Sequence, residues 1–146
     1  MGSPIFAVPV LEALIEASHD VLAVYSRPDR PSGRGNKTRP TAVKQAAIKY
    51  GLSIRQPASL NSKTAQDGIS DLNPELIVVA AYGLLLPREV LETPDFSCLN
   101  IHPSLLPRFR GPSPVSTAIF EGVEMTGVTI MQIDSGVDTG PIVSQI

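Results

Sequence analysis

Five consecutive apolar residues at positions 76–80, Leu-Ile-Val-Val-Ala, are the feature that most constrains the fold of this chain. The run lacks the polar alternation of a strand that has one face in water, so both of its faces must be covered. Strands of this kind belong to parallel sheets with helices on either side. Other short apolar runs alternate with helical segments of about ten residues, which favours an α/β fold with right-handed crossovers.

Periodicity and capping residues give the expected elements. Helices are predicted over residues 7–17, 42–50, 61–72, 87–91 and 114–120, and strands over 21–25, 53–55, 76–80, 98–102 and 128–133. This order indicates a Rossmann-like, mostly parallel sheet with helices on both faces. In such sheets ligands bind beyond the carboxyl ends of the strands, so polar residues at strand ends are the place to look for a site.

Composition excludes several classes of protein. The 146 residues are 42% hydrophobic with a net charge of -2, which fits one globular domain and excludes a disordered chain. No apolar run approaches the ~18 residues of a membrane span, and the first residues lack the layout of a signal peptide. The single cysteine, Cys98, excludes an internal disulfide and a thiolate-rich zinc site. We therefore expect a soluble, cytoplasmic domain that has no membrane contact.

Positive charge is concentrated in one Gly- and Pro-containing segment, residues 27–44. Its six basic residues face a single acid, Asp29, so the segment carries +5 and the rest of the chain -7. One interpretation is a mobile, solvated loop whose charge only aids solubility. The alternative is a contact with a polyanion such as nucleic acid or a phosphorylated ligand. The residues proposed for that contact are Arg27, Arg30, Arg34, Lys37 and Arg39.

Asn100 and His102 lie at the end of the strand predicted over 98–102. Their spacing of two places both side chains on one face, about 7 Å apart along the strand. Each alone is better explained structurally, His102 as a core histidine and Asn100 as a turn former. Together, before a loop held by Pro103 and Pro107, they suggest a site. An amide can stabilise an oxyanion, and an imidazole can shuttle a proton near neutral pH.

A second polar segment, residues 134–141, contains two carboxylates in a Gly-containing loop. Asp134 is explained by turn formation, whereas Asp138 is a candidate to pair with His102. No nucleophile elbow surrounds Ser104, which points to direct acyl transfer through a tetrahedral intermediate. The residues that could hold a metal ion are too scattered, so no metal is expected. Tyr82 and Gly83 follow another strand and could hold a flat ring through main-chain hydrogen bonds.

The run Asn-Ile-His-Pro-Ser-Leu-Leu-Pro at 100–107, followed by Arg110-Gly111 and by Asp138-Thr139-Gly140, resembles the folate-dependent formyltransferases. That match does not choose among the members of the superfamily. Residues 2–7, 28–37, 80–87 and 126–131 are similar to the methionyl-tRNA formyltransferases within it. The resemblance covers nearly the whole chain and implies the formyltransferase fold.

The resemblance also implies roles for individual residues. Asn100 would supply an oxyanion-binding amide, His102 would act as proton shuttle, and Asp138 would pair with His102. The donor would be 10-formyltetrahydrofolate, and the acceptor would be the α-amino group of initiator methionyl-tRNA, held by the basic segment. The folate would contact Tyr82, Gly83, Leu84, Leu85, Ser104, Leu105, Leu106, Pro107, Asp134 and Gly136.

The chain departs from the family pattern at both ends. The family's first strand precedes the Gly-Ser-Pro loop, whereas here the sequence starts at Met1-Gly2, and its barrel-like C-terminal domain does not follow Ile146. Residues 1–146 are therefore expected to be part of a catalytic domain, truncated at both ends, with one strand missing from the sheet. Two other functions stay open. One is formyl transfer to an amino-sugar nucleotide, which a donor assay would reveal, and the other is a folate-binding fragment that has no catalysis.

Overall fold

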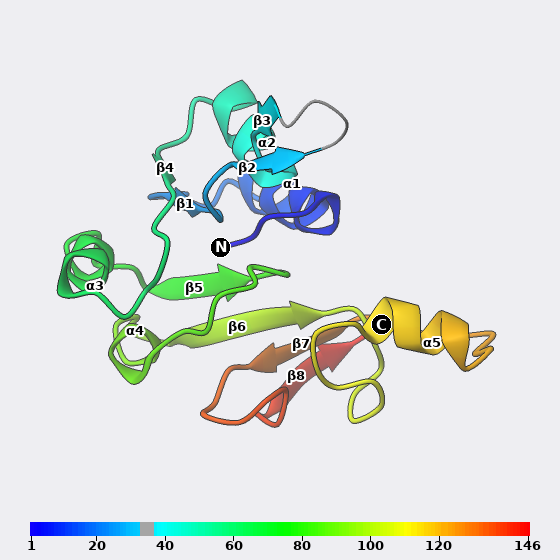
Figure 1. The fold of residues 1–146 in the computed structure, drawn as a ribbon. Helices are drawn as coiled ribbons and strands as arrows, with labels where there is room; N and C mark the ends of the chain where they lie inside the picture. The colour runs from blue at the N-terminus through cyan, green and yellow to red at the C-terminus, as the bar shows by residue number, and fades with distance from the viewer. Residues whose placement is uncertain (33–36) are drawn as a thin grey trace.

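The computed structural model describes residues 1–32 and 37–146 and has the expected α/β character (Figure 1). Within those ranges, no helix is long and apolar enough to cross a membrane. The helices are η1 (Ile5–Ala7), α1 (Val8–Glu16), α2 (Ala42–Lys49), α3 (Lys63–Ser70), α4 (Arg88–Leu91) and α5 (Pro114–Phe120). The strands are β1 (Val24–Tyr25), β2 (Arg30–Ser32), β3 (Lys37–Arg39), β4 (Ile54–Arg55), β5 (Leu76–Val79), β6 (Ser97–His102), β7 (Thr129–Gln132) and β8 (Ile142–Gln145).

The strand β6 is paired along both edges in a four-stranded sheet of order β5-β6-β7-β8. As the apolar run predicts, β5 is parallel to β6, with Val79 opposite Asn100. The expectation of a mostly parallel sheet is wrong for the other half, because β7 is antiparallel to β6 and β8 to β7. The segment 133–141 that joins β7 to β8 is shorter than the dozen or so residues of a parallel crossover, so this pair can only be antiparallel.

Helices cover both faces of the strands β1 and β5, as predicted (Figure 1). β1 pairs in parallel with β4, and its two residues point to opposite faces. On one face Val24 packs with α1 and α2, in a cluster that includes Leu11, Val43, Ala47 and Ala80. On the other face Tyr25 packs with α3 and α4, in a cluster that includes Ile69, Ile77, Val79 and Val90.

Met1 and Gly2 connect the two-stranded sheet of β1 and β4 to the four-stranded sheet. The Gly2 N–H donates to the Tyr25 carbonyl (2.9 Å), and the Ala80 N–H donates to the Met1 carbonyl (2.9 Å). The Met1 ammonium donates to the Val78 carbonyl (2.5 Å). Only glycine fits at position 2, because a Cβ there would lie 2.7 Å from Ala7 Cβ and 2.8 Å from the Ala80 carbonyl oxygen. The first two residues therefore act as a very short parallel strand between β1 and β5.

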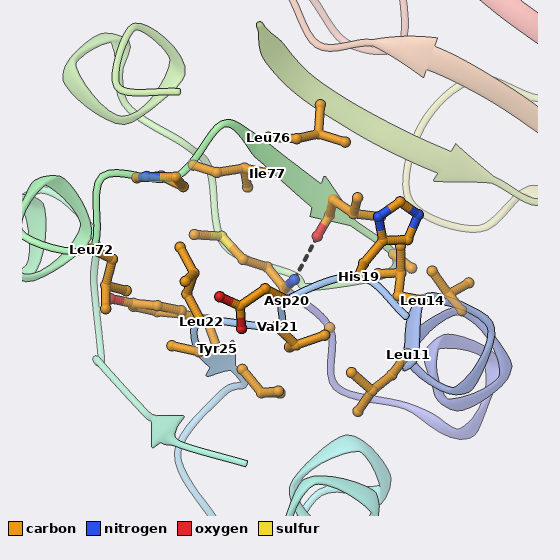
Figure 2. Close-up of a pocket in the computed structure, with 18 of the residues that line it drawn as sticks. Leu11, Leu14, His19, Asp20, Val21, Leu22, Tyr25, Leu72, Leu76 and Ile77 are labelled. Atoms are coloured by element: carbon orange, nitrogen blue, oxygen red, sulfur yellow. Dashed lines mark hydrogen bonds between the residues drawn. The ribbon is translucent and has the colours of Figure 1, made fainter. Parts of the chain in front are cut away.

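Beyond Met1, a cavity of about 580 Å³ separates residues 21–25 from β5 (Figure 2). Leu11 and Leu14 line it on the α1 side, and Ile69 and Leu72 line it on the α3 side. The cavity leaves a gap between residues 21–25 and β5, and Met1 and Gly2 close one end of it. The gap also explains why β1 is shorter than the strand expected over 21–25, since residues 21–23 border the cavity rather than a neighbouring strand.

Local sequence signals account for the ends of several helices. The Thr41 hydroxyl accepts from the Lys44 N–H (3.1 Å) at the start of α2, as expected, and Ser62 caps α3 in the same way. The helix α4 starts directly after Pro87, and Pro114 occupies the first turn of α5.

The basic segment contains an antiparallel hairpin rather than the loop that was expected. In this hairpin β2 pairs with β3, and Arg30 lies opposite Arg39. Like charges and proline disfavour strand pairing, so the residues of this segment do not predict the hairpin. The expectation that this segment is the least ordered part of the chain concerns residues 33–36 above all, which lie outside the described residues.

The buried amino group of Met1 should make the stability of this chain depend on pH. Burial lowers the pKa of the Met1 ammonium from 8.0 to about 5. The unfolded chain then binds this proton more tightly than the folded chain, so the free energy of unfolding rises from pH 5 to pH 8, by up to about 4 kcal/mol. Urea titrations at a series of pH values measure this rise. Acetylation of the Met1 nitrogen should remove it, and an equal rise in the acetylated chain would contradict the assignment.

The cavity beside Met1 should accept a short apolar extension. We expect Val-Ile-Val placed before Met1 to continue the parallel ladder along Val78, Ile77 and Leu76 and to raise the free energy of unfolding by a few kcal/mol. A Ser-Gly-Ser extension of equal length is the control, because it moves the charged amine but buries little apolar surface. Equal stability of the two extended chains would show that the cavity does not hold a strand.

Candidate active site

Asn100 and His102 lie on one face of β6, as their spacing predicts, and Asp138 approaches them from the loop between β7 and β8. The Asn100 amide Nδ2 donates to Asp138 Oδ1 (3.3 Å), and His102 Nδ1 lies 3.6 Å from Asp138 Oδ2. The imidazole is almost fully buried, and the Asp138 side chain is 15% exposed. β6 is paired with both neighbours at Asn100 and with β7 at His102, so the sheet backbone fixes the direction of both β6 side chains.

Asp138 reaches β6 from the loop between β7 and β8. Its backbone adopts a φ of 51°, a left-handed conformation that aspartate tolerates better than most residues. Asp134 closes this loop, accepting from the Gly136 N–H (2.9 Å) and from the Thr139 hydroxyl (2.8 Å). Asp134 and Gly136, both expected to contact folate, therefore shape the loop that carries Asp138.

A turn after β6, residues 108–111, contacts both members of the His102–Asp138 pair. His102 Nε2 lies 2.9 Å from the Phe109 carbonyl oxygen, and the Gly111 N–H donates to Asp138 Oδ2 (2.8 Å). The Phe109 carbonyl was not foreseen from the sequence, because main-chain contacts depend on backbone conformation rather than on side-chain type. The signal that could have indicated the turn is Gly111, which adopts a φ of 96° that other residues rarely take.

Of the residues in the loop after β6 that are expected to contact folate, some are buried and others are exposed. Ser104 is fully buried, and its hydroxyl donates to the Arg108 carbonyl (2.7 Å). Leu106 is also buried, and its N–H donates to the hydroxyl of Thr129 (3.1 Å). Leu105 and Pro107 are exposed and remain available to a ligand.

The segment 82–85 after β5, also expected to contact folate, contains both buried and exposed residues. Tyr82 is buried in the core, which raises the pKa of its hydroxyl to about 12. Gly83 has a φ of 76°, and its open side holds the Arg27 side chain, whose Nη1 would lie 3.3 Å from a Cβ. Leu84 is half-buried, and Leu85 is 89% exposed. Within the described residues, no hydrogen bond or ion pair joins this segment to the loop of Asp134.

The basic segment lies beside the end of β5, since Arg27 packs against Gly83. A shallow pocket of about 360 Å³ is lined by Arg27, Arg30, Arg39, Ser3 and Thr41, with Pro28 and Pro40. Three of the five cations expected to bind nucleic acid therefore border one pocket. Of the other two, Arg34 and the side chain of Lys37 lie outside the described residues.

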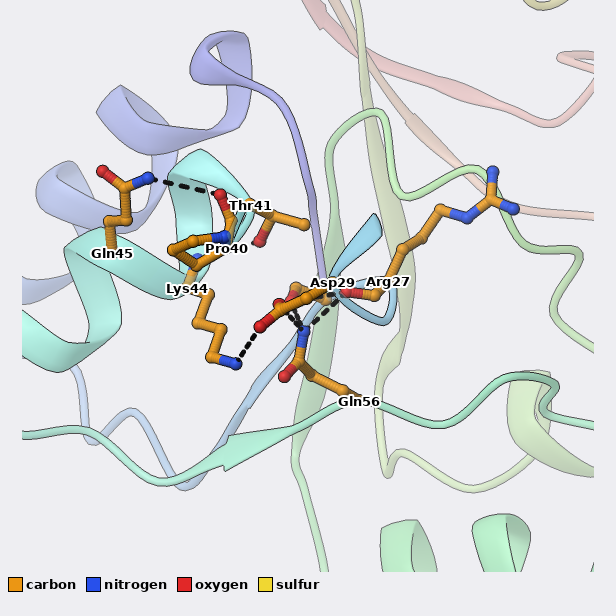
Figure 3. A network of polar contacts seen from close by, with 8 residues as sticks. Arg27, Asp29, Pro40, Thr41, Lys44, Gln45 and Gln56 are labelled. Carbon is orange, nitrogen blue, oxygen red and sulfur yellow. Dashed lines mark hydrogen bonds and ion pairs between the residues drawn. The ribbon is translucent and has the colours of Figure 1, made fainter. Parts of the chain in front are cut away.

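Two other charged residues of this segment, Asp29 and Lys44, form an ion pair with each other (Figure 3). Asp29 pairs with Lys44 (2.6 Å) and accepts from the Gln56 amide (2.8 Å), which also donates to the Arg27 carbonyl (2.7 Å). The hydrogen bond from Gln56 and the contact with Lys44 lower the pKa of the Asp29 carboxyl. The Arg27 backbone is thus anchored while its guanidinium extends away from the network.

Comparison with known proteins places this chain in a family. A model of the formyl transferase family matches residues 1–146. The chain is 54% identical to a methionyl-tRNA formyltransferase of Jannaschia sp. over 97% of its own length and 47% of the relative's. It is 53% identical to that of Novosphingobium aromaticivorans, over 100% of its own length and 48% of the relative's. The chain thus spans about half the length of the curated relatives it matches.

The fold is also similar to that of solved formyltransferases. The crystal structure of phosphoribosylglycinamide formyltransferase from Bacillus halodurans superposes with a TM-score of 0.78 at 24% identity, covering 99% of this chain and 75% of that one. At this identity the likeness supports the fold alone. The match over every residue to the family model is the stronger finding, and this chain belongs to the formyl transferase family.

Proposed function

We propose that this chain transfers a formyl group from 10-formyltetrahydrofolate to the α-amino group of methionine on initiator tRNA. The observation that carries the proposal is the contact of Asn100 and His102 with Asp138, which brings an amide donor, an imidazole and a carboxylate together. Relatives that share about half of its residues are named methionyl-tRNA formyltransferases. Transfer to an amino-sugar nucleotide is the less supported alternative, because these relatives act on tRNA by name.

The first step is attack of the neutral amine nitrogen on the formyl carbon, which forms a carbon–nitrogen bond and a tetrahedral oxyanion. Asn100 Nδ2 uses one hydrogen for Asp138 Oδ1, and its second hydrogen is free to donate to the oxyanion. Asp138 therefore orients the amide that stabilises the developing charge.

His102 takes the proton that the amine loses on attack. Asp138 Oδ2, 3.6 Å from Nδ1, stabilises the imidazolium that forms. When the bond between the formyl carbon and the folate nitrogen breaks, the same proton passes to that nitrogen. The ring then returns to its starting state, and no covalent enzyme intermediate is needed.

The donor would lie at the strand ends next to Asn100. Exposed Leu85 and Leu105 offer apolar surface for its flat ring, and the main chain of Gly83 offers polar groups. The segments Tyr82–Leu85 and Ser104–Pro107 and the loop of Asp134 and Gly136 would surround it, with Tyr82, Ser104 and Leu106 acting through main chain or packing because they are buried.

The basic pocket would hold the acceptor stem. Arg30 and Arg39 lie directly opposite each other, and a phosphate placed between two cations offsets their repulsion. Arg27 connects this pocket to Gly83 at the end of β5, so a bound nucleic acid would enter beside the strand that neighbours β6.

Replacing Asn100 by Ala should lower the turnover of formyl transfer by about 10²–10³-fold, because one oxyanion donor is lost. The measurement follows labelled formyl groups from 10-formyltetrahydrofolate into methionyl-tRNA, with folate binding determined separately and expected to change little. Asn61→Ala is the control, since Asn61 is exposed near the start of α3. Near-normal turnover of Asn100→Ala would contradict the oxyanion role, and formylation of an amino-sugar nucleotide instead of tRNA would favour the alternative.

Replacing both Arg30 and Arg39 by Ala should weaken tRNA binding and reduce its salt dependence, each phosphate contact contributing roughly 0.7–0.9 to the log–log slope. A matched control removes two cations elsewhere, Lys63→Ala with Arg88→Ala, which are exposed and paired within α3 and α4. Measuring tRNA binding at several salt concentrations distinguishes the two double variants. Equal slopes would mean that the hairpin charge acts only through net charge.

A further inference from the structure

The two nitrogens of His102 face different acceptors at different distances. Nε2 lies 2.9 Å from the Phe109 carbonyl oxygen, a full hydrogen bond, whereas Nδ1 lies 3.6 Å from Asp138 Oδ2. A carbonyl oxygen can only accept, so Nε2 must carry the hydrogen. In the neutral ring Nδ1 is then the nitrogen that has a free lone pair.

The same turn also fixes the carboxylate. The Gly111 N–H donates to Asp138 Oδ2 (2.8 Å), the oxygen that faces His102. The turn is itself anchored to the loop that follows β6, because the Ser104 hydroxyl donates to the Arg108 carbonyl (2.7 Å). Two main-chain atoms of one turn therefore hold the imidazole and its carboxylate partner.

The conformation of the turn explains why a glycine stands at position 111. Phe109 has a φ of 57° and Gly111 a φ of 96°. A Cβ on Gly111 would meet nothing within 4 Å, so only backbone conformation opposes another residue there. Substitution at position 111 thus changes the direction of main-chain groups without a side-chain clash.

We propose that the turn Arg108–Gly111 is the positioning element of the site and that it selects the Nε2–H tautomer of His102, leaving Nδ1 to accept the proton. The proposal rests on the proposed function and deepens it by naming the reacting nitrogen. It reverses the simpler arrangement in which Asp138 alone orients the ring by accepting from Nδ1–H.

The proton path then follows. The Nδ1 lone pair takes the proton of the attacking amine, and the imidazolium keeps its Nε2–H on the Phe109 carbonyl while Asp138 Oδ2, 3.6 Å from Nδ1, stabilises its charge. As the bond between the formyl carbon and the folate nitrogen breaks, Nδ1 returns the proton to that nitrogen, and the ring is again neutral.

Long-range ¹H–¹⁵N correlation spectra of the histidine-labelled chain test the tautomer directly. The sequence has two histidines, and the exposed His19 is removed from the spectrum by His19→Gln. We expect His102, once neutral, to carry its hydrogen on Nε2. A ring with hydrogen on Nδ1 alone, or one protonated on both nitrogens throughout the pH range, would overturn the proposal.

Substitutions then test the turn. Gly111→Ala should give a mixture of tautomers and lower turnover by about 100-fold with little change in KM for the donor, because the pair is misplaced. Gly122→Ala is the matched control, since Gly122 also has a positive φ (65°) and open space around it but lies at the end of α5. Phe109→Ala keeps the carbonyl and should keep the tautomer.

Gly111→Asn should restore part of the Nε2–H tautomer and part of the turnover, since asparagine adopts positive φ more readily than alanine. This variant replaces Gly111→Ala in the test if Gly111→Ala does not fold. Gly111 variants that match Gly122→Ala in tautomer and turnover would overturn the proposal. A chain without formyl transfer but with the Nε2–H tautomer would contradict the proposed function and support the positioning. An active chain whose neutral His102 carries its hydrogen on Nδ1 would support the proposed function and contradict the positioning by the turn.

Discussion

Pairing of β6 along both of its edges is the constraint on which the rest of the site depends. Val79 and Met131 flank Asn100, and Thr129 flanks His102, so backbone hydrogen bonds to two neighbours fix the strand. A strand in the middle of a sheet cannot shift its register without turning every side chain to the other face. The spacing between the amide and the imidazole is therefore set by the sheet rather than by flexible loops.

The turn after β6 and the loop after β7 complete the site that the sheet positions. Asp138 receives hydrogen bonds from Asn100 and Gly111 and lies beside His102, so one carboxylate joins β6, the turn after it and the loop after β7. The antiparallel direction of β7 and β8 makes this possible, because the short connection between them returns across β6. A purely parallel sheet would have needed a longer connection at this point.

The sequence predicts those parts of the structure that depend on local patterns. The apolar run at 76–80 identified β5, the period of two placed Asn100 and His102 on one face, and Thr41 marked the start of α2. The direction of β7 and the pairing of β2 with β3 depend on contacts between distant segments, and a pattern in one segment does not encode them. The contacts of the Phe109 carbonyl and the Gly111 N–H were not predicted, because every residue except proline carries the same main-chain groups. Asp138 was found by side-chain type, whereas the atoms that hold it were not.

A double-mutant cycle between His102 and Asp138, measured on the rate of formyl transfer, tests most directly whether the two act as one unit. Non-additivity is expected, with His102→Ala combined with Asp138→Ala losing less activation free energy than the two single losses together, because the part of Asp138 that acts through the imidazole is lost only once while its contact with Asn100 is lost in either background. Fully additive losses of activation free energy in the double variant would contradict this pairing, since Asp138 would then contribute nothing to transfer through His102.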